Sequence, residues 1–312
     1  MARRQTKRRV FALVAVLLGL GTVAVGYELL IQYTQRGMLA RAVEKYVAAA
    51  ADADFLIAAV GDSHVKGKEA PPGFDYPTQL ELRLRTLRPQ SKIRVANIGE
   101  AGYNTSQAVD RLGNVIEKTG RYPDLVIFTA GYNNIWNFQK AWFIPEDIQG
   151  RQLDQQLRYL LAKSANYRLG VITLERMHQL LDENQGYRGH NTAVFNEDDP
   201  NEVKFLSSWI KRDVEGLATS LGDQGTRVLL VTYWHPYRWV DEAFEALAET
   251  DNVDVADVRG LGFDGLSDGQ LADAFIAPGS HPNKYGYARV AELVAKAMDE
   301  DGLLPPEKPG NP

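Results

Sequence analysis

The chain has 312 residues, of which 45% are hydrophobic and 24% are charged, the ordinary composition of a globular protein. It contains no cysteine, which excludes a disulfide, a thiolate nucleophile and a cysteine-ligated metal site. The net charge of −5 is unevenly distributed along the chain, because residues 1–9 hold five of the 35 basic side chains and no acid. The remaining 30 basic and 40 acidic side chains give −10, which argues against a nucleic-acid partner, since phosphate binding needs a basic surface.

The N-terminal segment predicts a membrane anchor. Basic residues 1–9 precede Val10–Tyr27, which carries no charge and is about as long as the shortest membrane-spanning helix. We therefore predict a transmembrane anchor over 10–31; a signal peptide removed near 24–27 is the alternative. The basic flank predicts that the N-terminus stays in the cytoplasm of a bacterium and that the body is exported across the inner membrane. Residues 32–53 are predicted to form a helical stalk.

The rest of the chain alternates between apolar runs and amphipathic stretches. The apolar runs predict strands at 55–60, 93–99, 125–130, 227–233 and 253–258. The amphipathic stretches predict helices at 76–87, 105–118, 202–221 and 282–298. This alternation predicts a parallel sheet with right-handed crossovers in a three-layer α/β/α sandwich, with the flavodoxin-like strand order 2-1-3-4-5. The predicted domain covers 54–302, and the Pro/Gly-rich tail 303–312 is expected to be disordered.

Residues 139–201 interrupt the alternation. Helices are predicted there at 153–163 and 167–183, followed by a polar loop. An insertion after the third strand would overhang the crevice at the sheet edge, so it is either a lid or a packing elaboration. His178 and His190 lie in it without metal-ligand spacing, and no metal site is predicted.

Groups suited to acyl transfer follow the strands. Gly61-Asp62-Ser63 predicts a sharp turn that presents a hydroxyl above the sheet edge, and His281 precedes the last helix. Acyl transfer needs a hydroxyl that attacks, an imidazole that takes its proton and donors for the oxyanion. The donors are predicted to be the backbone N–H groups of Ser63 and Gly102 and the side-chain amide of Asn133. Gly102 suits this role because it lacks a Cβ.

Four segments together resemble blocks I, II, III and V of the SGNH/GDSL hydrolase superfamily, in the right order. They are Gly61-Asp62-Ser63, Asn97-Ile98-Gly99-Glu100-Ala101-Gly102, Gly131-Tyr132-Asn133-Asn134 and His281-Pro282-Asn283-Lys284-Tyr285-Gly286-Tyr287. The resemblance covers about 54–299 without the insertion. It implies a flavodoxin-like fold and ester hydrolysis without a cofactor. It further implies Ser63 as nucleophile, His281 as general base, and Ser63, Gly102 and Asn133 as the oxyanion hole.

The sequence departs from the family pattern at three positions. The family places an aspartate three residues before the histidine, where this chain has Pro278, whose backbone carbonyl could still accept a hydrogen bond. The site is thus predicted to be a Ser–His dyad or a triad whose acid comes from elsewhere. Asn134 replaces an aspartate, with an expected structural role, and His64 replaces an aliphatic residue, with an expected supporting or packing role. The carboxylates considered as the acid or as support are Asp62, Asp273, Asp264 and Asp268.

Aromatic side chains follow the strands on the crevice side and are candidates for lining a substrate site, with ordinary packing as the alternative. They are Tyr103, Tyr132, Trp136, Phe138, Trp142 and Phe143, and His235 joins them after the fourth strand. The sequence favours an exported serine esterase acting on a small acyl group, with O-acetyl on a cell-envelope glycan as the expected substrate. Two alternatives stay open: an O-acyltransferase on the same fold, and a catalytically silent glycan- or lipid-binding domain. Oligomeric state is not predicted.

Overall fold

The computed structural model describes residues 2–140, 157, 160–181, 199–259, 267, 269–270, 273 and 281–306. The chain forms two compact units. One consists of Met1–Ala40 with Gln149–Asn191, and the other of Arg41–Ile148 with Thr192–Pro312.

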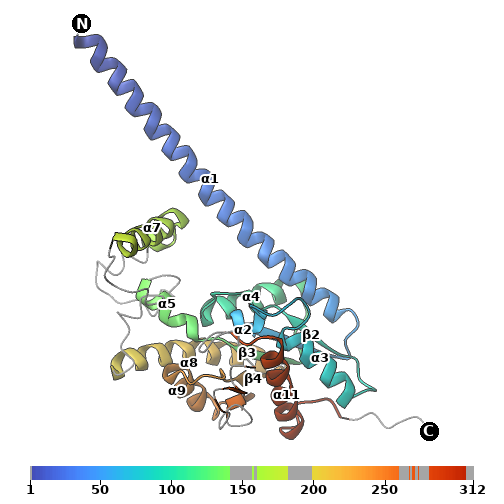
Figure 1. Ribbon diagram of the computed structural model, residues 1–312. Helices are drawn as coiled ribbons and strands as arrows, with labels where there is room; N and C mark the ends of the chain where they lie inside the picture. Colours follow the sequence, from blue (N-terminus) through green and yellow to red (C-terminus); the bar gives the residue numbers. More distant parts are fainter. Residues whose placement is uncertain are drawn as a thin grey trace. The chain divides into compact units, whose positions relative to one another are not determined.

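The second unit is built on a five-stranded parallel sheet in the order β2-β1-β3-β4-β5 (Figure 1). The strands are β1 Phe55–Gly61, β2 Ile93–Asn97, β3 Leu125–Thr129, β4 Arg227–Val231 and β5 Val253–Ala256. The predicted sheet, its parallel pairing and its strand order are confirmed. All five strands therefore point their carboxyl ends to the same edge, where a doubly wound sheet carries its site.

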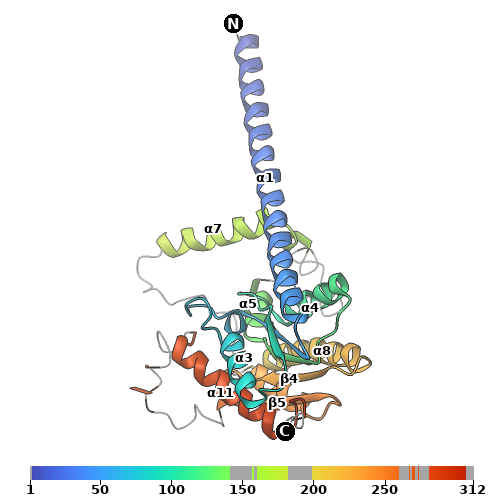
Figure 2. The ribbon, with the colours of Figure 1, turned by 90° about the vertical axis from the view of Figure 1, so that its right-hand side faces the viewer.

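Helices cover both faces of this sheet, which confirms the three-layer sandwich. On one face α3 (Tyr76–Leu87) packs against α11 (Lys284–Glu300) and both contact the sheet; Figure 2 shows these two helices side by side. On the other face α4 (Thr105–Thr119), α8 (Pro200–Gly222) and α9 (Arg238–Leu247) pack in sequence. The central strands β1 and β3 are apolar and almost entirely buried, as expected for strands covered on both faces.

Three helices of this unit are absent from the sequence-based prediction. α9 carries its buried side chains at helical spacing, with Trp239, Val240, Ala243, Phe244 and Leu247 facing the core. That pattern is an ordinary helix signal that the prediction overlooked between the fourth and fifth strands. α5 (Tyr132–Lys140) begins directly after β3, so Asn133 and Asn134 lie in its first turn rather than in a loop. The short α2 (Ser63–Lys66) follows β1 in the same way.

Residues 157 and 160–181 of the insertion belong to the first unit. Within that unit α1 (Ala2–Ala50) supplies Glu28, whose carboxylate accepts hydrogen bonds from Ala165 N at 2.9 Å and Asn166 N at 3.4 Å. These amides open α7 (Ala165–Leu181), so Glu28 satisfies the unpaired donors at its N-terminus. The lid interpretation stays a prediction.

Among the described residues, a search for a helix with the length and apolar character needed to cross a membrane finds none. The anchor over 10–31 thus stays a prediction from the sequence. In the second unit, the end of α1 is packed, because Tyr46 is fully buried and its hydroxyl donates to the Arg121 carbonyl at 3.0 Å.

Candidate active site

The turn that carries Ser63 is shaped by the residues just before it. Gly61 ends β1 with φ +154°, and a Cβ at this position would collide with the backbone carbonyl of Thr129 on β3. The Asp62 amide donates to that carbonyl at 3.1 Å, and the Asp62 carboxylate accepts from the His64 amide at 2.9 Å, capping α2. Ser63 is thereby placed at the first position of a helix, 8% exposed at the carboxyl edge of the sheet.

The structure brings Ser63 and His281 together although 218 positions separate them along the chain. His281 Nε2 lies 2.7 Å from Ser63 Oγ, within hydrogen-bond distance. His281 stands two residues before the N-cap of α11, Asn283, whose side chain accepts from Tyr285 N at 2.8 Å and Gly286 N at 3.1 Å. The capped helix fixes the backbone from which the imidazole reaches the serine.

The surroundings keep His281 neutral. Burial lowers the pKa of His281 to about 4, helped by the nearby charges of His64 and Lys68 and opposed by Asp62. A neutral imidazole with Nε2 facing a hydroxyl can accept its proton, whereas an imidazolium cannot. The pair therefore has the geometry and the protonation state of a nucleophile and its base.

Asp62 is the centre of a buried hydrogen-bond network behind this pair. It is fully buried, and its Oδ2 accepts from the Tyr233 hydroxyl at 2.6 Å and from Asn133 Nδ2 at 3.4 Å. Its Oδ1 lies 3.2 Å from His64 Nδ1. The His64 ring in turn lies 4.8 Å, centroid to centroid, from the rings of both Tyr233 and His281. His64 therefore adjoins the base, and Asp62 acts on His281 through its charge.

Tyr233 has no place among the predicted site residues. It lies two residues after the end of β4 and is 3% exposed. Its hydroxyl accepts from the Tyr132 amide at 3.2 Å while donating to Asp62. Burial and the Asp62 charge raise the pKa of Tyr233 far above its usual value, so its hydroxyl stays protonated. The available signal was its position: β4 ends at the same sheet edge as the other site strands.

The predicted oxyanion donors lie at three strand ends. The Ser63 amide is in the first turn of α2, where amides have no partner within the helix. Gly102 has φ +80°, and a Cβ there would meet nothing within 4 Å; the turn requires glycine for its backbone conformation, and the space beside it is open. Asn133 Nδ2 donates to the Tyr103 carbonyl at 3.1 Å and to Asp62, so an oxyanion would have to replace one of these acceptors.

Asn134 is a fully buried link between two helices. Its Oδ1 accepts from Thr105 N at 3.0 Å, and its Nδ2 donates to Thr105 Oγ1 at 2.9 Å. Thr105 opens α4 and also donates to Asp213 Oδ2 at 2.5 Å; burial raises the pKa of that carboxyl. These contacts give Asn134 a structural role, because they fix Thr105 and with it the end of the turn that contains Gly102.

One carboxylate near His281 was not predicted at all. Glu69 Oε1 lies 3.9 Å from His281 Nδ1, on the side of the ring opposite Nε2. Asp273 is exposed, and its backbone carbonyl, not its carboxylate, accepts from Asn283 Nδ2 at 2.9 Å. Pro278, Asp264 and Asp268 lie outside the described residues. Glu69 has no sequence signal beyond its closeness to Ser63, because its loop matches none of the motifs.

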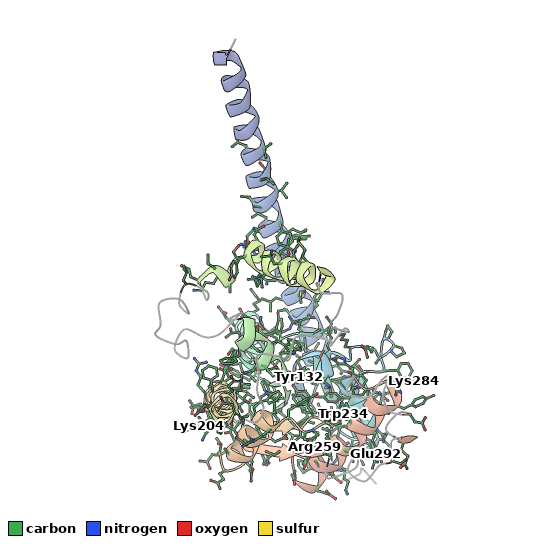
Figure 3. All side chains as sticks on the ribbon, turned by 60° about the vertical axis from the view of Figure 1, so that its left-hand side comes forward. Tyr132, Lys204, Trp234, Arg259, Lys284 and Glu292 are labelled. Atoms are coloured by element: carbon green, nitrogen blue, oxygen red, sulfur yellow. The ribbon has the colours of Figure 1, made fainter. Side chains whose placement is uncertain are left out.

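The predicted aromatic candidates divide into two groups. The Tyr132 ring lies 4.7 Å from Tyr237 and 6.5 Å from Trp136, and exposed His235 lies 5.2 Å from Tyr237, so these rings gather where β3 and β4 end. Figure 3 labels Tyr132 and Trp234, which come from these two strand ends. Tyr103 instead packs under Arg111, whose guanidinium lies 5.5 Å from its ring. Phe138 packs on Phe205, and Trp142 and Phe143 lie outside the described residues.

In the part of the chain that the structure describes, no three His, Asp or Glu side chains form a group able to hold a metal ion.

Comparison with known proteins returns matches among solved structures. No model of a protein family and no curated protein matches the sequence. A lipolytic protein of the G-D-S-L family from Desulfitobacterium hafniense DCB-2 is 13% identical over 78% of this chain and 99% of that one, with a TM-score of 0.46. The psychrotrophic esterase EstA from Pseudoalteromonas sp. is 13% identical over 80% and 100%, with a TM-score of 0.47. A GDSL-like lipase from Parabacteroides merdae ATCC 43184 is 15% identical over 81% and 98%, with a TM-score of 0.45.

The names of the Desulfitobacterium and Parabacteroides proteins place those two in the GDSL group that the four sequence segments resemble.

Proposed function

We propose that this chain is a serine ester hydrolase of the SGNH/GDSL type. The observation that carries the proposal is the 2.7 Å distance between Ser63 Oγ and His281 Nε2, at the carboxyl edge of a parallel sheet. A buried serine–histidine contact could also be structural. Three features favour catalysis: the histidine is neutral, the serine is at a helix start, and Gly102 leaves open space at the neighbouring strand end.

The reaction follows from the placement of these groups. Ser63 Oγ attacks the ester carbonyl carbon while His281 Nε2 takes its proton, a step worth about 10²- to 10⁴-fold in rate. The oxyanion is bound by the amides of Ser63 and Gly102, joined by Asn133 once its amide turns from its present acceptor. His281 then gives the proton to the departing alcohol, leaving an acyl-Ser63 ester. Water, activated by the same imidazole, releases the acid and restores the serine.

The proposal is tested by active-site labelling and turnover. The full chain should react with a fluorophosphonate probe and hydrolyse p-nitrophenyl acetate. Ser63→Ala should lose both, with a fall in kcat/KM of about 10³-fold or more, because the nucleophile is gone. Ser220→Ala is the matched control, since that exposed serine at the end of α8 only donates to its own helix, to the Leu217 carbonyl. A folded wild-type chain that neither labels nor turns over would contradict the proposal.

The proposed substrate is a small acyl ester, O-acetyl on a cell-envelope glycan. The support is the gathering of Tyr132, Trp136 and Tyr237 near the site, because aromatic rings stack on sugars, together with the predicted export of the domain. Product analysis with acetylated glycans separates hydrolysis from transfer to a second sugar. Saturable glycan binding without turnover would instead favour the silent binding domain that Pro278 suggests.

Attachment to a membrane is part of the same proposal. Its support is the uncharged run Val10–Tyr27 behind the basic residues 1–9. The full chain produced in bacteria should stay with the membrane fraction after alkaline carbonate washing, with its second unit open to protease from the periplasmic side. Release into the wash would contradict the anchor and leave the esterase proposal untouched.

A further inference from the structure

We propose that the Glu69 carboxylate is the acid partner of His281, replacing the aspartate that the family pattern places where this chain has Pro278. Glu69 would accept the Nδ1–H of His281, fix the ring with Nε2 toward Ser63, and stabilise the imidazolium that forms when the serine proton moves. This inference rests on the proposed esterase function and makes Glu69 a positioning residue for it.

The first support is the placement of the carboxylate. Glu69 Oε1 is 3.9 Å from His281 Nδ1, while Nε2 on the other side of the ring is 2.7 Å from Ser63 Oγ. The order carboxylate, imidazole, hydroxyl is the order of a catalytic triad. A distance of 3.9 Å is longer than a hydrogen bond, and catalytic hydrogen bonds are often long in the free enzyme and tighten when substrate binds.

The second support is the backbone at Glu69. Its φ is +72°, a left-handed conformation that is uncommon for a residue with a side chain. Such a conformation is strained and is concentrated at functional sites. The two glycines in this loop, Gly67 and Gly73, also have positive φ, at +76° and +83°. Glutamate at a position that glycine would fill without strain indicates that its side chain is needed there.

The third support is the way the loop is tied to both ends of the pair. The Lys68 amide donates to the Ser63 carbonyl at 3.0 Å, which fixes the loop to the nucleophile's own helix. The Tyr287 hydroxyl donates to the Lys68 carbonyl at 3.1 Å, and Tyr287 is buried in α11, the helix that begins just after His281. The residue next to Glu69 is therefore held by the elements that carry the serine and the histidine.

The charges around His281 give the carboxylate a definite task. His64 and Lys68 disfavour a positive imidazole, and Asp62 favours it. Asp62 is shared by Tyr233, Asn133 and both the amide and the ring of His64, so its charge is spread over three residues. Among the described residues, Glu69 brings a carboxylate oxygen to 3.9 Å from Nδ1, where the proton of the neutral ring lies when Nε2 accepts from Ser63.

The test compares Glu69→Gln and Glu69→Asp with Glu117→Gln, a matched change at an exposed position on α4. Three readouts are taken on the full chain: kcat/KM for p-nitrophenyl acetate against pH, thermal unfolding, and the pKa of His281 by NMR titration, assigned with His281→Gln. Glu69→Gln should lower kcat/KM by about 10- to 100-fold. This is less than the loss of about 10⁴-fold when a buried triad aspartate becomes asparagine, because Glu69 is 34% exposed.

In Glu69→Gln the pKa of His281 should also fall, because a negative charge beside the ring has been removed while His64, Lys68 and Asp62 remain. Glu69→Asp should restore part of the rate and of the pKa, and Glu117→Gln should change neither. An unchanged rate and pKa in Glu69→Gln would overturn the inference while leaving the esterase intact. So would a rate loss with an unmoved pKa and no rescue by aspartate, because that marks a structural role only. If the wild type neither labels nor turns over, the esterase proposal itself fails, and the His281 titration still reports whether Glu69 acts on the ring.

Discussion

Ser63 is fixed by the backbone that surrounds it, whereas His281 is fixed by side chains that reach it from other segments. Around Ser63, Gly61 lies against β3, the Asp62 amide bonds to Thr129, and the Asp62 side chain caps α2. Around His281, the neighbours are His64 and Glu69, which lie more than 200 positions earlier in the sequence. The nucleophile is thus placed by backbone contacts between its own turn and the neighbouring strand, and the base by side chains from distant segments.

This difference has a consequence for how each residue tolerates change. A turn held by close backbone packing should either keep its structure after a substitution or lose it entirely, because protein interiors have little spare volume. A ring held by separate side chains should lose its orientation step by step, as each neighbour is altered.

Replacing His281 by glutamine removes the base and leaves the serine turn unchanged. We expect kcat/KM for p-nitrophenyl acetate to fall by about 10³-fold or more, because glutamine cannot take the Ser63 proton at neutral pH. Thermal unfolding should change little, because the contacts of the Ser63 turn remain. The control is the double variant Ser63→Ala/His281→Gln, which should be no slower than either single variant, since the pair acts as a unit. Additive losses would show that the two residues work independently.

This contrast also explains how far the sequence could be interpreted. The apolar runs and their alternation with helices predicted the sheet, its order and its layers, because hydrophobic periodicity and the crossover rule act at the scale of whole elements. The Ser63 turn was predictable as well, since Gly61, Asp62 and Ser63 are consecutive. Glu69 and Tyr233 were not, because their roles arise only when distant segments meet at one sheet edge, and neither belongs to a motif with fixed spacing.

Gly61→Ala probes the serine turn itself. A Cβ here would overlap the Thr129 carbonyl and the Val65 side chain, and the φ of +154° is unfavourable for alanine. Overpacking and backbone strain each cost on the order of 1–3 kcal/mol, so we expect the free energy of unfolding to fall by about 3 kcal/mol or more. Chemical denaturation measures this change.

Gly113→Ala is its matched control. Gly113 lies within α4, where a new Cβ meets nothing within 4 Å. That variant should be more stable than the wild type by about 0.5–1 kcal/mol, because alanine favours a helix. If both variants proved neutral, the serine turn would not be held by close packing and the contrast with His281 would be lost.

Tyr233→Phe probes the network that joins the two regions. The lost hydroxyl donates to Asp62 at 2.6 Å and accepts from the Tyr132 amide at 3.2 Å, and both groups are then left short of a partner. We expect the free energy of unfolding to fall by about 1–3 kcal/mol. Tyr46→Phe is the matched control, because the buried Tyr46 hydroxyl donates to a neutral carbonyl, that of Arg121. For Tyr46→Phe we expect the free energy of unfolding to fall by only about 1 kcal/mol, because a hydrogen bond to a neutral carbonyl is weaker than one to a buried carboxylate. Equal losses in the two variants would argue that Asp62 needs no support from Tyr233.

The pH dependence gives the smallest effect and acts on the base alone. Because burial lowers the pKa of His281 to about 4, the imidazole stays neutral over most of the range in which an unperturbed histidine, at 6.5, would gain a proton. As pH falls from 7 to 5, kcat/KM should therefore stay nearly constant, and it should be halved only near pH 4. Stability should change earlier: between about 4 and 6.5 the unfolded chain binds more protons at this site, so its contribution to stability is lost as pH falls through that window. Steady-state rates and circular dichroism over the same pH series separate the effect on catalysis from the effect on stability. If the rate of the folded protein were already halved near pH 6.5, the His281 ring would be solvated. The side-chain restraint that distinguishes His281 from Ser63 would then be absent.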